Sequence, residues 1–121
     1  MKQIKLIIKT ETENYPIIIG RKICVKISQI TKLNSIDFNK CLFVVDRKVP
    51  KKFVSTIIKS VKDKTSYIHY FRADEKNKNM NSINKILEIL LNKNFSRDDC
   101  LISIGGGITG DISGFAASLF K

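Results

Sequence analysis

The sequence has few of the residues that build metal and disulfide sites. It contains one histidine, His69, and three cysteines, Cys24, Cys41 and Cys100. The cysteines are widely separated, form no CxxC pair and have no histidine cluster to complete a zinc site. We therefore expect His69 to take a core or strand-face position, and the cysteines to stay reduced in the cytoplasm.

Long apolar stretches are missing as well. Lys5 and Lys9 interrupt the N-terminal segment, and no small-residue cleavage site follows it. The pattern indicates neither a signal peptide nor a membrane-spanning helix. Internal repeats, low-complexity tracts and Pro/Ser-rich linkers are also absent, which predicts one domain over residues 1–121.

Acidic residues are outnumbered, since 22 lysines and arginines against 11 aspartates and glutamates give a formal net charge of +11. A nucleic-acid interface would gather this charge in a patch. The lysines are instead spread through every segment, together with abundant Ile and Asn. This distribution favours biased codon usage as the source of the positive charge. We therefore expect neither nucleic acid nor membrane as a partner. A phosphorylated small molecule remains compatible with the charge.

Strand and helix signals alternate along the chain. Period-two or fully apolar runs predict strands at residues 4–8, 15–19, 41–45, 67–71 and 100–104. Residues 23–30, 53–61 and 83–91 have helical spacing, and Asn81 or Ser82 could cap the last of these helices. The alternation predicts an α/β fold with a Rossmann-like, mostly parallel sheet. Ligands in such sheets bind beyond the carboxyl ends of the strands.

A glycine-rich segment follows the last strand. Residues 105–111 read GGGITGD and satisfy G-x-G-x-x-G between a strand and a helix, the context in which this motif binds a dinucleotide. Gly105 and Gly107 can adopt unusual dihedrals beside a pyrophosphate, and Gly110 permits close helix packing. No Gly-Lys-Ser/Thr follows, so a Walker loop is not indicated. The alternative is a simple glycine turn.

Three charged residues are weaker candidates when read by themselves. Asp46 ends its strand, where it could accept hydrogen bonds from a ribose or simply form a turn. Glu75 and Lys78 could be a solvated charge pair.

The segment GGGITGDISGFAASLFK closely resembles the GGG-x-x-GD-x-x-GFAA segment of 3-dehydroquinate synthases. Tyr15–Gly20 resembles an early strand of that family, Val44–Asp46 its first nucleotide strand, and Glu75–Lys78 its Glu-x-x-Lys motif. The resemblance extends over essentially the whole chain. It implies the NAD-binding N-terminal domain of the dehydroquinate synthase-like fold, incomplete and without the C-terminal metal and substrate domain.

The resemblance also implies roles for individual residues. Asp46, Glu75 and Lys78 would contact the ribose side of NAD. The residues expected at or beside the pyrophosphate are Gly106, Gly107, Ile108, Thr109, Gly110 and Asp111. Neither catalytic residues nor metal ligands are expected within this chain.

For the complete enzyme, the resemblance implies a lyase that cyclises 3-deoxy-arabino-heptulosonate 7-phosphate to 3-dehydroquinate and releases phosphate. This reaction belongs to the shikimate pathway toward chorismate and the aromatic amino acids. NAD and a divalent metal, zinc or cobalt, would be the cofactors of a cytoplasmic homodimer. The chain alone would be inactive.

Other functions stay open. Related sugar-phosphate cyclases and polyol dehydrogenases share a glycine-rich NAD loop, although Gly110-Asp111 and Phe115-Ala116-Ala117 favour the synthase. A noncatalytic NAD-binding module or a basic nucleic-acid-binding protein is the alternative from another class. Nucleic-acid affinity would fall steeply with salt and would not depend on Gly107.

Overall fold

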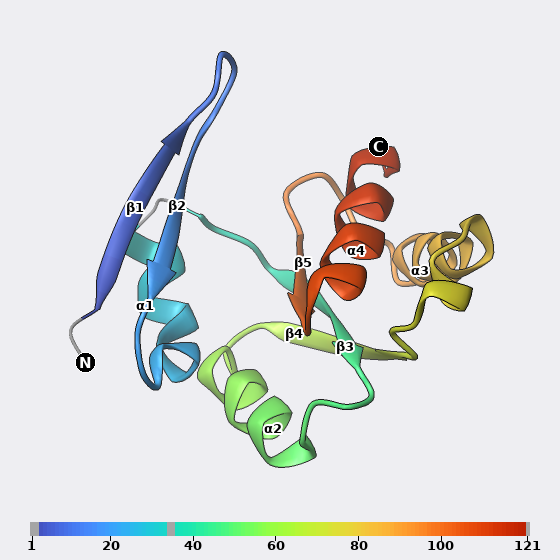
Figure 1. Ribbon diagram of the computed structural model, residues 1–121, viewed down its shortest axis with the longest axis horizontal. Helices are drawn as coiled ribbons and strands as arrows, with labels where there is room; N and C mark the ends of the chain where they lie inside the picture. The colour runs from blue at the N-terminus through green and yellow to red at the C-terminus, as the bar shows by residue number, and fades with distance from the viewer. Residues whose placement is uncertain (1–2, 34–35, 121) are drawn as a thin grey trace.

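The computed structural model describes residues 3–33 and 36–120 and has the predicted α/β architecture (Figure 1). In chain order its elements are β1 (Ile4–Lys9), β2 (Asn14–Ile19), the 3-10 helix η1 (Ile23–Lys26), α1 (Ile27–Leu33), β3 (Lys40–Asp46), α2 (Lys51–Ser60), β4 (Thr65–Phe71), the 3-10 helix η2 (Glu75–Asn77), α3 (Met80–Asn92), β5 (Cys100–Ile104) and α4 (Gly107–Leu119). Every strand and helix predicted from the sequence is present.

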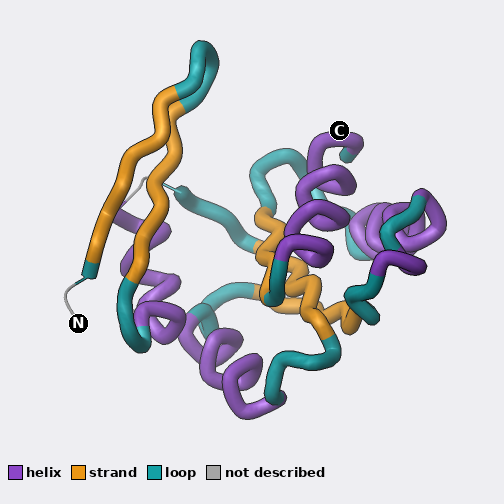
Figure 2. Tube along the Cα trace, viewed as in Figure 1, coloured by secondary structure: helices purple, strands orange, loops and turns teal. Residues whose placement is uncertain are grey.

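The central sheet is parallel and has the strand order β4-β3-β5. Residues 41–45 of β3 are fully buried, as expected for a middle strand covered on both faces. Helix α2 covers one face of this sheet, and α3 and α4 cover the other (Figures 1 and 2). The carboxyl ends of β3 and β5 therefore lie side by side.

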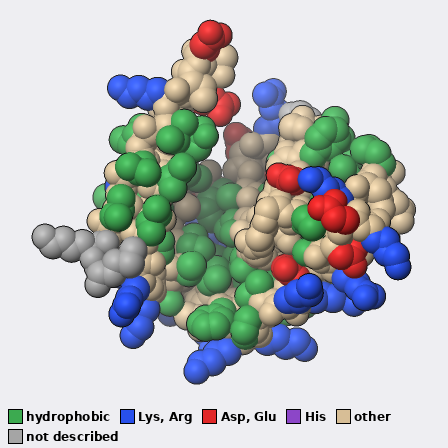
Figure 3. Space-filling view, in the orientation of Figure 1, with side chains coloured by type: hydrophobic (Ala, Val, Ile, Leu, Met, Phe, Trp, Pro, Cys, Tyr) green, Lys and Arg blue, Asp and Glu red, His purple; other side chains and the backbone are tan. Residues whose placement is uncertain are grey.

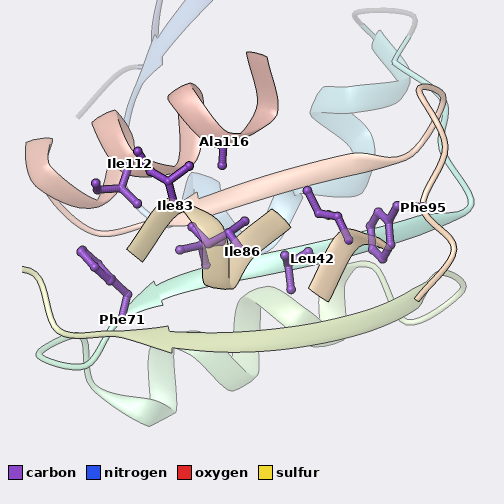
Figure 4. Close-up of a cluster of buried hydrophobic side chains, with 9 residues drawn as sticks. Leu42, Phe71, Ile83, Ile86, Phe95, Ile112 and Ala116 are labelled. Carbon is purple, nitrogen blue, oxygen red and sulfur yellow. The ribbon is translucent and has the colours of Figure 1, made fainter. Parts of the chain in front are cut away.

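Two apolar clusters hold the layers together, because alternate β3 side chains point to opposite faces. Leu42 and Val44 pack with α3 and α4 residues such as Ile86 and Ile112 (Figure 4). Phe43 and the other odd-numbered β3 residues pack against α2. The buried clusters fix both helix layers on β3 and so set the positions of the loops at its carboxyl end.

The N-terminus of α3 differs from the expectation. Asn79 is the capping residue, and its side-chain oxygen accepts a hydrogen bond from the Ser82 N–H at 3.0 Å. The helix thus begins at Met80, and the predicted cap at Asn81 or Ser82 is wrong. An Asn three residues before a free helix N–H satisfies that donor directly, so the earlier asparagine is the effective cap.

Strands β1 and β2 form an antiparallel hairpin in which Ile4 pairs with Ile19. The hairpin stands apart from the parallel sheet, with α1 beside it (Figures 1 and 2). The period-two pattern of residues 4–8 predicted one buried face, but Leu6 is 48% exposed. Ile17, its partner across the hairpin, is 40% exposed. Figure 3 shows apolar side chains along the hairpin and in the hollow beside it. None of the helices in the described ranges is long and apolar enough to cross a membrane.

Candidate functional site: the carboxyl edge of the parallel sheet

The glycine loop after β5 packs closely against the end of β3. Gly105 has a φ of 155°, the only positive φ among the described glycines. A Cβ on Gly105 would lie 2.9 Å from the Asp46 Cβ and 2.8 Å from the Thr109 Oγ1. Only glycine fits at such a position. The structure therefore brings Asp46 and the loop together, as the sheet order predicts.

Gly107 does not need glycine for its backbone conformation, contrary to the expectation, because it is the first residue of α4. Gly106 precedes the helix in an extended conformation and supplies no side-chain cap. The first intrahelical bond runs from Gly110 N to Gly106 O. The N–H groups of Gly107, Ile108 and Thr109 therefore have no partner among the described residues. They lie at the positive end of the helix dipole, which attracts anions.

Open space surrounds this helix start. A Cβ at Gly106, Gly107 or Gly110 would meet no heavy atom within 4 Å. The predicted close packing of a neighbouring helix at Gly110 is therefore wrong in this structure. The space and the free N–H groups together form a place where a phosphate group can reach the backbone.

The side chains of Ile108 and Thr109 point inward. Ile108 is half-buried against the apolar cluster of α3 and α4. Thr109 is fully buried, and its Oγ1 has no hydrogen-bond partner among the described residues. Ser113, one turn later and 2% exposed, also leaves its hydroxyl unpaired. The polar group that Ile108 can offer a ligand is its main-chain N–H.

Lys78 and Asp111 form an ion pair, with Lys78 Nζ 3.1 Å from Asp111 Oδ2. The hydrogen bond and the charge of Asp111, with a smaller effect from Glu75, raise the pKa of Lys78. Glu75 is exposed at the start of η2, where Asp74 caps the turn by accepting a hydrogen bond from Asn77 N. The pair connects the segment after β4 to the second turn of α4. Sequence reasoning had named both residues but had not paired them.

A pocket of about 360 Å³ lies beside this ion pair. Its apolar wall comes from α3 and α4, and its residues are Lys78, Asn79, Met80, Ile83, Asp111, Ile112 and Phe115. An apolar pocket with a few charged groups at its rim suits a small organic ligand. A larger pocket, about 510 Å³, lies at the other end of β5 around Phe95, Asp99 and Cys100, so it is separate from the glycine loop.

Asp46 forms a turn at the end of β3. Its Oδ1 accepts a hydrogen bond from Lys48 N at 3.0 Å, which confirms the turn-forming interpretation. Oδ2 accepts no hydrogen bond from the described residues, and an ionised carboxylate has further acceptor sites. Both roles weighed from the sequence, turn former and hydrogen-bond acceptor for a ligand, are therefore compatible with the geometry.

His69 lies half-buried in β4, in the strand position predicted for it. Burial lowers the pKa of its imidazole, and the positive charges of Lys85 and Arg47 lower it further. Among residues 3–33 and 36–120, no three His, Cys, Asp or Glu side chains gather where they could hold a metal ion.

Solved structures share this fold. A 2-deoxy-scyllo-inosose synthase matches 96% of the chain with a TM-score of 0.84, at 19% sequence identity and over 33% of its own chain. Another structure of 2-deoxy-scyllo-inosose synthase, complexed with carbaglucose-6-phosphate, NAD+ and Co2+, matches 97% of the chain with a TM-score of 0.83, also at 19% identity, over 32% of its own chain. The expected dehydroquinate synthase-like fold is confirmed.

Sequence comparison finds 3-dehydroquinate synthases. The family model for the 3-dehydroquinate synthase N-terminal region matches residues 68–121. The 3-dehydroquinate synthase of Pelagibacter ubique (strain HTCC1062) is 56% identical over all 121 residues, which cover 33% of that protein. The enzyme of Staphylococcus haemolyticus (strain JCSC1435) is 33% identical over 105 residues, 87% of this chain and 28% of that protein. The chain thus spans about a third of the length of these relatives, and its sequence is similar to the N-terminal part of 3-dehydroquinate synthases.

Proposed function

We propose that this chain is the NAD-binding part of a 3-dehydroquinate synthase. The observation that carries the proposal is 56% identity over the entire chain with the Pelagibacter ubique enzyme. The structure supports it, because the glycine loop, Asp46 and the Lys78–Asp111 pair all lie at the carboxyl edge of the parallel sheet. This edge is where dinucleotides bind in α/β sheets.

The local geometry fits NAD. The free N–H groups at the start of α4 and the open space over Gly106 and Gly107 suit its pyrophosphate. Asp46 would accept hydrogen bonds from a ribose through its unused oxygen. Glu75 in η2 and Lys78 directly after it would hold the ribose side, and Asp111 would keep Lys78 in place. The remaining members of the proposed pyrophosphate site are Ile108, Thr109 and Gly110.

The proposed reaction is the cyclisation of 3-deoxy-arabino-heptulosonate 7-phosphate to 3-dehydroquinate with release of phosphate, which is a lyase reaction of the shikimate pathway. Bound NAD supplies the transient oxidation of a substrate alcohol. The residues of this chain bind and orient the cofactor, and its backbone N–H groups offset the pyrophosphate charge.

Further features of the proposal concern the complete protein. We expect a cytoplasmic homodimer that uses a divalent metal, zinc or cobalt, and a phosphorylated substrate, with no nucleic acid or membrane as a partner. The chain of 121 residues should not release phosphate by itself, because it spans only 33% of the Pelagibacter ubique relative and provides no cluster of metal ligands within its described residues.

A chimeric enzyme tests the function. This chain would replace the matching third of the Pelagibacter ubique protein, and phosphate release from the heptulosonate phosphate would be measured with and without NAD. NAD-dependent turnover by the chimera supports the proposal. A folded, soluble chimera that binds substrate but never turns it over in the presence of NAD and metal contradicts it.

The main alternative is another sugar-phosphate cyclase, since two solved structures of 2-deoxy-scyllo-inosose synthase share the fold. Comparing glucose 6-phosphate with the heptulosonate phosphate in the complete protein that contains this chain tests this alternative, because the chimera takes its substrate domain from the Pelagibacter ubique enzyme. The proposed function predicts activity with the seven-carbon acid only.

A further inference from the structure

A second, basic pocket lies at the outer edge of the parallel sheet, beside the edge strand β4. It measures about 250 Å³, and its residues are Arg47, His69, Tyr70, Phe71, Arg72, Asn77, Ser82 and Lys85. It shares no residue with the candidate nucleotide site. Its walls come from the loop after β3, from the end of β4 with the segment that follows it, and from the first two turns of α3.

The positive charge in this pocket is largely uncompensated. Arg47 and Lys85 take part in none of the ion pairs among the described residues. Arg72 is paired with Asp74, with 3.4 Å between its Nε and the carboxylate Oδ2, but its guanidinium has further N–H donors. No acidic residue lines the pocket.

Neutral donors add to this charge. Ser82 is only 8% exposed, and its hydroxyl forms no hydrogen bond with a described residue, because the bond to Asn79 uses the Ser82 N–H. Ser82 also lies in the first turn of α3, a helix of 13 residues, so the positive end of the helix dipole faces the same region. The Ser82 Oγ still reaches solvent, so it can donate a hydrogen bond to an acceptor that enters the pocket.

The positive charges of this pocket also act on the imidazole of His69. Its pKa is lowered first by burial and then by Lys85 and Arg47, the two cations without an ion-pair partner among the described residues. An anion between these cations would offset their charge and favour the imidazolium form.

We propose that this pocket is an anion site for a phosphate group, held by Arg47, Lys85 and the Ser82 hydroxyl and separate from the glycine loop. Its chemistry suits inorganic phosphate or the phosphomonoester of a small sugar. The volume and the guanidinium groups, which can bind phosphate oxygens in pairs, fit such a group.

The test uses the full chain, in which His69 is the only histidine. Inorganic phosphate is titrated at constant ionic strength with chloride as balance, while the proton NMR signal of the imidazole C2–H is followed. We expect a saturable shift and a rise in the pKa of His69. Ribose 5-phosphate, titrated in the same way, identifies the natural source. Tighter binding than inorganic phosphate assigns the site to a sugar phosphate, and equal or weaker binding assigns it to the free ion.

Matched variants locate the site. Lys85→Gln and Ser82→Ala should each weaken phosphate binding by about threefold or more. Lys52→Gln removes the same charge from an exposed position on α2, which covers the other face of the sheet, and should leave binding unchanged. A linear, unsaturable shift of the His69 signal would overturn the proposal, as would equal weakening by Lys52→Gln and Lys85→Gln. Because NAD is absent from this titration, its result is independent of the proposed function.

Discussion

Lys78 Nζ lies 3.1 Å from Asp111 Oδ2, so an ion pair holds the segment after β4 against α4. Both side chains remain partly exposed, at 44% and 63%. Exposed pairs contribute little to folding. The pair therefore matters chiefly for the shape of the ligand site, where it sets the position of a cation near the start of α4.

Replacing either partner of this pair should weaken NAD binding without affecting stability. We expect Lys78→Gln and Asp111→Asn to reduce NAD affinity about tenfold, because a charge-assisted contact is lost or misplaced. Calorimetric titration with NAD measures the change. Lys76→Gln, which removes an exposed charge two residues earlier in the short helix η2, is the control and should bind NAD normally. Equal affinities of Lys78→Gln and the control would contradict the assigned role.

Gly105→Ala should destabilise the fold. The added methyl group would lie under 3 Å from Asp46 Cβ and Thr109 Oγ1, at a φ of 155°. We expect a loss of about 1–3 kcal/mol in the free energy of unfolding, measured by urea denaturation. Gly106→Ala is the comparison, because its methyl group would meet nothing within 4 Å. It should cost less than about 1 kcal/mol. Equal losses would show that the contact with Asp46 is unimportant.

Gly107→Val should leave stability nearly unchanged but weaken NAD binding. Nothing within 4 Å obstructs a Cβ at this position, so the variant should unfold at nearly the same urea concentration as the original chain. The branched side chain would occupy the space proposed for the pyrophosphate. We expect NAD affinity to fall by at least about tenfold. Unchanged NAD affinity in the folded variant would reject the phosphate role of this loop.

Ser113→Ala should stabilise the chain. The Ser113 hydroxyl is buried at 2% exposure without a hydrogen-bond partner among the described residues, so its removal relieves a desolvation penalty. Alanine is also the better helix former. We expect a gain of about 1 kcal/mol in the free energy of unfolding. The control is Ser118→Ala, where the exposed hydroxyl donates to Phe115 O at 2.7 Å and a neutral or slightly unfavourable effect is expected.

Ionisation of Asp99 should make the free energy of unfolding depend on pH in the acid range. Burial acts against its ionisation, but hydrogen bonds from the N–H groups of Ser96 and Lys40 outweigh this effect and lower its pKa. A lowered pKa in the folded state means that the carboxylate stabilises the fold above its unfolded pKa, about 4. This contribution is lost as pH falls through the lower folded pKa.

Asp99→Asn tests this dependence, because its side chain does not ionise. Urea denaturation at pH 7 and at pH 3 should show a smaller acid-induced loss of stability than in the original chain. We expect a difference below about 1 kcal/mol, since the site is solvent-accessible. Asp98→Asn, in the same loop, is the control and should keep the original pH dependence. An undiminished loss in Asp99→Asn would contradict the assignment.

The local sequence pattern was sufficient to predict the strands of the parallel sheet. The fully apolar run at residues 41–45 predicted a central parallel strand, and residues 100–104 predicted β5 with the observed bounds. The prediction for β3 succeeded because burial on both faces leaves a direct trace in composition. The edge strand β5 is only partly buried. The hairpin shows the limit of this reasoning. Its period-two pattern gave the strands, but periodicity carries no information on what covers the apolar face, and Leu6 and Ile17 are exposed.

The sequence by itself determined the alternation of strands and helices, the glycine loop after β5 and the resemblance to 3-dehydroquinate synthases. The tertiary structure alone decided that Gly105 contacts Asp46, that Lys78 pairs with Asp111, and that Arg47 and Lys85 share a pocket. These residues are distant in the chain, and their meeting depends on strand order and helix packing. Local propensities determine where helices and strands form. The packing of helices on the two faces of β3 determines which loops come together.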